Sequence, residues 1–153
     1  EGNPIREAGE SIVRVMLDTN ILVSMIIFPN QLFLDMLAAI TKHHKLVLSS
    51  YVLNELYDVV RRKFPKGQEA FKKFLAAIPY EIFVTPQDMD LGLFEIRDAM
   101  DYPVLYSAIV AKADVLITGD KDILTVKHIN RPEILTARDF VAKFGEDVEI
   151  EKE

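Results

Sequence analysis

The chain has 153 residues, of which 50% are hydrophobic, and it carries a formal net charge of −6. A chain of this length and composition is expected to form one domain around a single buried core. The negative charge argues against a generic basic nucleic-acid binder, and the lack of cysteine excludes disulfides and thiolate metal sites.

Apolar runs in this chain fall short of the roughly 18 residues that a membrane-spanning helix needs, and the polar residues 1–10 lack a signal-peptide core. We therefore expect a soluble, cytoplasmic protein without a membrane partner. A single domain is predicted over residues 12–145, with flexible termini at 1–11 and 146–153.

The first predicted element is a strand at residues 12–17, a nearly continuous apolar run. Apolar residues at helical spacing then predict helices beginning near residues 21 and 32, and a short strand follows at 46–48. Ser49 or Ser50 can cap the next helix, which Pro65 and Gly67 close. A helix over about residues 68–77 and a third short strand at 82–84 come next.

In the second half, apolar residues between 91 and 96 predict a helix, and Pro103 suits the first turn of the helix after it. A strand is predicted at 115–118, before a turn at Gly119, and a shorter strand at 134–135. Thr136 can cap a last helix. This alternation of strands and helices is typical of an α/β sandwich built on a mostly parallel sheet.

Acidic residues follow the predicted strands at the points where those strands end. They are Asp18, Glu55, Asp98 with Asp101, and Asp120 with Asp122. Ligands of open α/β sheets bind beyond the carboxyl ends of the strands, so we expect these carboxylates to converge. Other interpretations remain open at this point: Asp18, Asp101 and Asp122 can each cap a helix, and Glu55 can interact with a helix dipole.

Like charges gathered in a partly dry cleft repel one another and raise one or more pKa values unless a cation is present. Oxygen ligands without cysteine or paired histidines favour Mg²⁺ or Mn²⁺, as one ion or as two. Such ions activate water for attack on a phosphodiester. The sequence therefore predicts a divalent-metal site for phosphate ester chemistry.

Four short segments together resemble the PIN-domain family of metal-dependent ribonucleases. They are residues 15–20 (VMLDTN), 53–56 (LNEL), 98–101 (DAMD) and 117–124 (ITGDKDIL). The similarity extends from about Val13 to Phe144, and within the family it is strongest to PIN-type toxins of toxin–antitoxin pairs.

The resemblance implies a three-layer α/β/α fold, PIN-like, with a parallel sheet in the order 3-2-1-4-5. It also implies that the chain is an endoribonuclease that uses Mg²⁺ or Mn²⁺ to hydrolyse single-stranded RNA through metal-activated water. Relatives often dimerise and are silenced by a cognate antitoxin. A homodimer and an antitoxin partner are therefore implied as well.

The matching positions give the implied site residues. The catalytic and metal-binding acids are Asp18, Glu55, Asp101 and Asp120. Asp122 is implied as a further metal ligand, and Asp98 can take the place of Asp101. Asn20 and Thr118 would orient the ligating carboxylates.

A basic stretch lies beyond Glu55 on the same predicted helix and on the next one. It contains Arg61, Arg62, Lys63, Lys66, Lys72 and Lys73. The first four are candidates to bind an RNA backbone or an acidic segment of an antitoxin. The other interpretation is a solvated helix face.

Other functions compete with that of a metal-dependent endoribonuclease. One is a catalytically inactive PIN-like module that binds RNA or a protein. An aspartyl-phosphate phosphatase also begins with an aspartate after its first strand, but usually has a second aspartate where this chain has Asn20. A dinucleotide-binding oxidoreductase fits less well, because no G-x-G-x-x-G follows the first strand.

Overall fold

The structure is a computed structural model that describes residues 12–145. Its elements in chain order are β1 (Arg14–Leu17), α1 (Thr19–Ile27), α2 (Gln31–His43), β2 (Lys45–Ser49), α3 (Ser50–Lys63), η2 (Pro65–Gly67), α4 (Gln68–Ala77), β3 (Glu81–Phe83), η3 (Ala99–Asp101), α5 (Tyr102–Val110), β4 (Val115–Ile117), α6 (Lys121–Leu124), β5 (Glu133–Leu135) and α7 (Ala137–Phe144). The η elements are short 3₁₀ helices.

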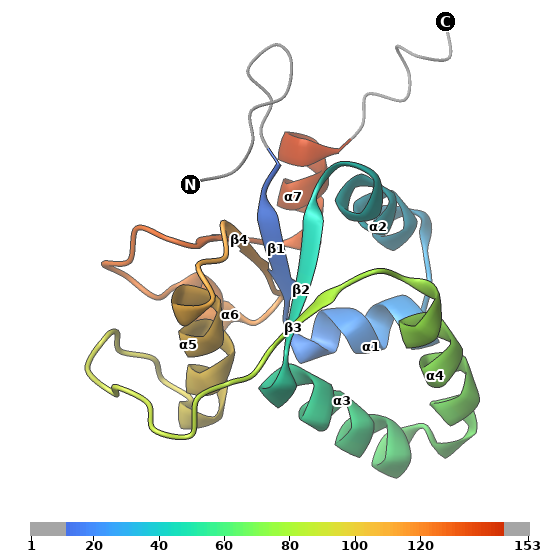
Figure 1. Cartoon of the computed structure of the whole chain (residues 1–153), viewed down its shortest axis with the longest axis horizontal. Helices are drawn as coiled ribbons and strands as arrows, with labels where there is room; N and C mark the ends of the chain where they lie inside the picture. Colours follow the sequence, from blue (N-terminus) through green and yellow to red (C-terminus); the bar gives the residue numbers. More distant parts are fainter. Residues whose placement is uncertain (1–11, 146–153) are drawn as a thin grey trace, which may run out of the picture.

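Five strands form one sheet in the order β3-β2-β1-β4-β5, and every neighbouring pair is parallel. The register places Leu17 of β1 beside Ile117 of β4, so the two strands end at the same level. Helices cover both faces, with α5 on one side of the sheet and α1 and α2 on the other (Figure 1). The predicted three-layer architecture and strand order are thereby confirmed.

The core forms where the helices press their apolar faces onto the sheet. Fully buried side chains come from both the strands and the helices, and the largest are Phe71, Phe140, Leu17, Leu22, Met36, Ile40, Leu48, Leu56, Leu105, Leu116, Ile117 and Ile123. In the part of the chain that the structure describes, no single helix is long and apolar enough to cross a bilayer. Only α1 and α2 taken together reach that length and composition, and they are bent by 117° relative to each other.

Side-chain caps start most of the helices that leave the carboxyl ends of the strands. Ser49 Oγ accepts a hydrogen bond from the backbone N–H of Val52 at 3.1 Å, and Thr136 Oγ1 accepts one from Asp139 at 3.1 Å. Both caps agree with the prediction, as does Pro103 in the first turn of α5. These caps satisfy backbone N–H groups that have no partner within the helix, and so fix where each helix begins.

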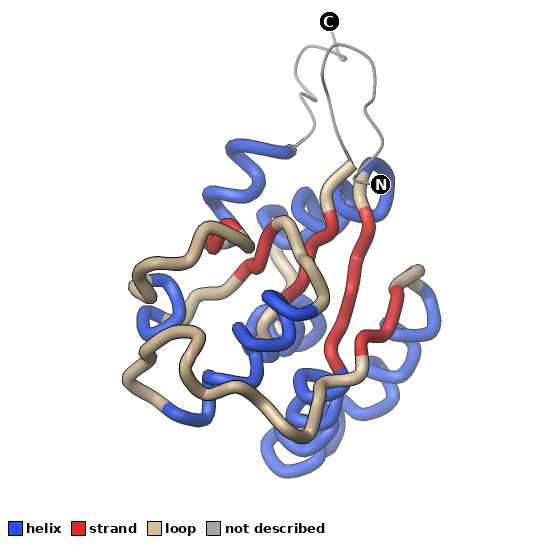
Figure 2. The backbone as a smooth tube through the Cα atoms, turned by 60° about the vertical axis from the view of Figure 1, so that its left-hand side comes forward, coloured by secondary structure: helices blue, strands red, loops and turns tan. Residues whose placement is uncertain are grey.

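The predicted helix at residues 91–96 is wrong, because this segment belongs to a long irregular loop between β3 and η3 (tan in Figure 2). Two of the apolar residues that suggested it, Leu91 and Leu93, are 71% and 43% exposed. Phe94 alone is buried, and its ring stacks on Tyr102 with a centroid separation of 4.1 Å. The hydroxyl of Tyr102 also accepts from the N–H of Leu93 at 3.3 Å and donates to the carbonyl of Asp90 at 2.6 Å. Contacts with α5 therefore take the place of helical hydrogen bonds.

Candidate metal centre

Asp18 lies directly after the central strand and is 5% exposed. Its Oδ1 accepts a hydrogen bond from the N–H of Thr19 at 2.6 Å, which caps α1, and its Oδ2 accepts one from Thr118 Oγ1 at 2.7 Å. Burial raises the pKa of Asp18, and the bonds from Thr118 and Thr19 oppose that shift. One carboxylate oxygen thus caps α1, while the other accepts a hydrogen bond from the residue that follows β4.

Two threonines link the acids of three separate elements into one group. Thr19 Oγ1 donates to Glu55 Oε1 on α3 at 2.6 Å. Thr118 Oγ1 accepts a hydrogen bond from the N–H of Asp120 at 3.0 Å. The charges of Glu55 and Asp120 also act to raise the pKa of Asp18. These contacts place Asp18, Glu55 and Asp120 near one another at the carboxyl edge of the sheet.

Asp101 joins this group from η3, at the start of α5. It occupies the N-cap position of α5 but makes no capping hydrogen bond with its side chain. Its Oδ2 is buried and has no hydrogen-bond partner within residues 12–145. Burial, followed by a hydrogen bond with Asp120 and the charge of that residue, raises the pKa of Asp101 to about 7. Two carboxyl groups can share a hydrogen bond only while one holds a proton, so the pair needs a proton or another cation.

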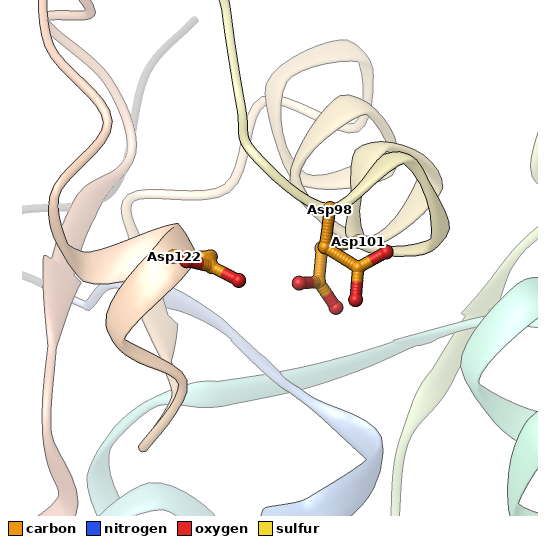
Figure 3. A group of neighbouring side chains, drawn as sticks. All are labelled: Asp98, Asp101 and Asp122. Carbon is orange, nitrogen blue, oxygen red and sulfur yellow. The ribbon is translucent and has the colours of Figure 1, made fainter.

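Asp98 and Asp101 both face Asp122 across the space between η3 and α6, as Figure 3 shows. One oxygen from each of the three residues lies within 4.8 Å of the others. Asp98 Oδ1 also caps η3, where it accepts a hydrogen bond from the N–H of Met100 at 3.0 Å. The sequence left open whether Asp98 or Asp101 faces the site; in the structure both point toward Asp122, and the choice of metal ligand stays a prediction.

Asp122 is held by an arginine that the sequence analysis did not single out. Nε and Nη2 of Arg97 donate to Oδ1 and Oδ2 of Asp122 at 2.9 and 2.7 Å. The hydrogen bonds and charge of Arg97 lower the pKa of Asp122. The N–H of Asp122 donates to Asp120 Oδ1 at 2.8 Å, so it is Asp120 that caps α6.

Tyr51 is a second residue of the site that was missed. Its hydroxyl donates to the carbonyl of Met100 at 2.9 Å and so ties the start of α3 to η3. Burial, and then the charges of Glu55, Asp101 and other nearby carboxylates, raise the pKa of Tyr51 to about 12. The hydroxyl is protonated at neutral pH even without this shift, and it acts as a hydrogen-bond donor here. No local pattern marks this tyrosine, because its partner lies 49 residues away in the sequence.

Asn20 is exposed at the start of α1. The residue before it, Thr19, makes the hydrogen bond to Glu55 that supports the group from this helix. The predicted role of Asn20 in orienting the carboxylates stays a prediction. Thr118 does bond to Asp18, in the position expected of a residue that orients a ligand.

The basic stretch lies toward the far end of α3, which runs from the sheet edge toward α4 (Figure 1). Arg61 and Arg62 both form ion pairs with Asp58, at 2.8 and 3.1 Å. Lys63 and Lys66 are exposed. This arrangement leaves the RNA-binding or partner-binding role of the stretch a prediction.

The donor set fits a hard divalent cation. The candidate ligands are all carboxylate oxygens, which are the ligands that Mg²⁺ and Mn²⁺ prefer. The partnerless buried Oδ2 of Asp101, together with the raised pKa values of Asp101 and Asp18, indicates a lack of positive charge at this edge of the sheet. A divalent cation would supply it.

Comparison with known proteins gives two findings. A family model described as "PIN domain" matches residues 14–122. The chain is also similar to a solved structure, the crystal structure of VapBC2 from Rickettsia felis bound to a DNA fragment from their promoter. That match has a TM-score of 0.61 and 25% sequence identity, and it covers 80% of this chain and 96% of the other. A search of curated proteins found no match.

Proposed function

The chain belongs to the PIN-domain family, and on that premise we propose that it is an endoribonuclease that depends on Mg²⁺ or Mn²⁺. The observation that carries the proposal is the state of Asp101. Its carboxyl lies beside Asp120, has one buried oxygen without a partner among the described residues, and has a pKa raised to about 7. A purely structural carboxylate would be paired or solvated, because an unpaired buried charge is costly.

In this proposal the carboxylates of Asp18, Glu55, Asp101 and Asp120 hold the cation, and Asp98 and Asp122 border it. A divalent ion supplies the Lewis acid that activates water and neutralises the phosphate. Thr19 and Thr118 keep the carboxylates aimed at one place, since each binds an acid on a neighbouring element.

Burial of Asp18 has a further consequence for how the site works. Its carboxylate is fixed by two hydrogen bonds, so little reorganisation is needed when a cation arrives. The same burial disfavours the ionised form of Asp18 when no cation is present. The site is therefore expected to bind its ion more tightly as pH rises and its acids lose their protons.

The proposed substrate is single-stranded RNA, whose phosphates would interact with the bound cation. The exposed cations Arg61, Arg62, Lys63 and Lys66 are candidates to bind RNA phosphates or an acidic partner. Phosphate contacts of this kind supply affinity rather than sequence preference.

We further propose that the chain is the toxin of a toxin–antitoxin pair, with an antitoxin protein as partner and a homodimer as its assembly. The similarity to VapBC2, together with the family, supports this part of the proposal. Purification of the chain together with the product of a neighbouring small gene, followed by measurement of the mass of the complex, tests both the partner and the assembly.

RNA cleavage is tested with an end-labelled single-stranded oligonucleotide, with Mn²⁺ or with EDTA. The wild type is expected to cleave only with Mn²⁺, and Asp18→Asn is expected not to cleave, since asparagine can still cap α1 but is a poorer metal ligand. Asp35→Asn, on the exposed face of α2, is the matched control and should cleave like the wild type.

The chemistry of the product ends distinguishes the proposed cleavage from cleavage by contaminating nucleases that use the 2′-hydroxyl of the RNA. Attack by water leaves no 2′,3′-cyclic phosphate, whereas attack by the RNA's own 2′-hydroxyl does. Equal cleavage by Asp18→Asn, or no Mn²⁺-dependent cleavage by the wild type, would contradict the proposal and favour a non-catalytic binding module.

A further inference from the structure

Arg97 lies in the loop before η3, directly ahead of the N-cap residue Asp98, and its side chain reaches across to Asp122 on α6. Both oxygens of Asp122 accept from the guanidinium, at 2.9 and 2.7 Å. The fork of an arginine matches a carboxylate in this paired geometry, which makes the contact directional. The side chain of Arg97 is 79% exposed and that of Asp122 is 20% exposed, so the arginine approaches the less exposed carboxylate from a position open to solvent.

The acids at this edge of the sheet therefore fall into two parts with different charge balance. Asp18, Glu55, Asp101 and Asp120 are joined to one another through threonine hydroxyls and a carboxyl pair, without a cationic side chain among these contacts. Asp122, in contrast, already forms an ion pair with the positively charged side chain of Arg97. The charge of Arg97 also acts on Asp98 and Asp120, but its hydrogen bonds go to Asp122.

Geometry alone would allow a second cation nearby. Asp98, Asp101 and Asp122 can each offer an oxygen within 4.8 Å of the others, and two-metal nucleases hold their ions about 4 Å apart. A divalent ion at that place would have to lie against the guanidinium of Arg97 or displace it from Asp122. Like charges at such short range repel one another, because a contact distance is well inside the Debye length.

We propose that Arg97 takes the place of a second metal ion, so that the chain binds one divalent cation, at Asp18, Glu55, Asp101 and Asp120. The inference rests on the proposed metal-dependent function and specifies how many ions serve it. Asp122 then acts as an anchor for the arginine and not as a metal ligand. The guanidinium then supplies a permanent positive charge beside the single ion, so that no second metal ion is needed.

The test counts Mn²⁺ ions bound by the metal-free protein, with isothermal titration calorimetry for the stoichiometry and electron paramagnetic resonance for the distance between ions. The wild type is expected to bind one ion with the spectrum of isolated Mn²⁺. Arg97→Met removes the charge and keeps much of the side chain's length, so it should bind a second ion at Asp98, Asp101 and Asp122. The two ions, about 4 Å apart, should then show a spin-coupled spectrum.

Three further variants make the result specific. Arg97→Lys keeps the positive charge and should bind one ion. The double variant Arg97→Met with Asp122→Asn removes a ligand of the second ion and should return to one. Arg131→Met is the matched control, because Arg131 is an exposed arginine paired with Asp114 at 2.7 Å, before β4 and so at the other end of that strand. It should bind one ion.

Each outcome bears on the inference. Two ions in the wild type, or a single ion in Arg97→Met, would overturn it while leaving a metal-dependent nuclease in place. No Mn²⁺ binding by the wild type would overturn this inference and the proposed function together. Thermal unfolding of the metal-free protein shows whether Arg97→Met is folded. If it is not, Arg97→Gln provides a second uncharged variant, which is expected to bind two ions as well.

Discussion

Substitution of Asp101 by asparagine is expected to stabilise the metal-free protein at neutral pH. The pKa of Asp101 is raised from 3.8 to about 7 in the folded chain. Between those two pH values the folded protein holds a proton that the unfolded chain releases. The free energy of unfolding therefore falls as pH rises from about 4 to about 7, and above pH 7 the whole penalty is present.

The size of the effect follows from the shift. Each pKa unit corresponds to about 1.4 kcal/mol, so a shift from 3.8 to about 7 would cost ~4 kcal/mol in a fully buried group. Asp101 is only partly buried, and solvent screens part of the repulsion, so we expect about half of that, ~2 kcal/mol. For a chain of this length, 2 kcal/mol changes the melting temperature by about 4–8 °C.

The assay is urea unfolding of the wild type and Asp101→Asn at pH 5 and pH 8, each with EDTA and with Mn²⁺. With EDTA, the variant should exceed the wild type by ~2 kcal/mol at pH 8 and by less at pH 5. With Mn²⁺ the order should reverse, because the wild type gains about 2.7 kcal/mol when the ion is present at 100 times its dissociation constant. A variant that is less stable than the wild type at pH 8 in EDTA would refute the argument that this carboxylate is held against repulsion.

Three further changes probe the supports of the site and its separation from the core. Thr118→Val removes the hydroxyl that donates to buried Asp18, so unfolding in urea at pH 7 should show a loss of about 2 kcal/mol, and calorimetry should show weaker Mn²⁺ binding. Tyr51→Phe breaks the bond to the carbonyl of Met100 and should cost about 1 kcal/mol in the same unfolding assay, again with weaker Mn²⁺ binding. Phe140→Ala opens a cavity in the fully buried face of α7 and should cost about 3–5 kcal/mol, but calorimetry should give an unchanged Mn²⁺ affinity.

The sheet could be predicted from the sequence because its strands are short apolar runs that end at acids or turn residues. Parallel strands bring their carboxyl ends to one edge, so the positions of Asp18 and Asp120 along the chain already placed them near each other. Asp18 follows β1 directly, and Asp120 follows β4 after Thr118 and Gly119. Glu55 is less direct, since its place depends on the pitch of α3 and on the hydrogen bond from Thr19.

Contacts between distant segments could not be predicted in this way. The bond from Thr19 to Glu55 spans 36 residues, that from Tyr51 to Met100 spans 49, and that from Arg97 to Asp122 spans 25. None of these pairs lies on one element, so no periodicity connects them. In the sequence, Arg97 also looks like any solvated surface residue, because its partner Asp122 lies on a separate helix.

The wrong helix has a physical cause in Tyr102. Its ring stacks on Phe94, and its hydroxyl bonds to the loop at Leu93 and Asp90, which takes the segment out of helical geometry. Tyr102 is also the first residue of α5 and follows Asp101 directly. The loop that contains Arg97 is thus held, at Asp90, Leu93 and Phe94, by the residue that directly follows Asp101. The local apolar pattern does not show whether this segment is a helix or a loop, because the residue on which Phe94 stacks belongs to another element.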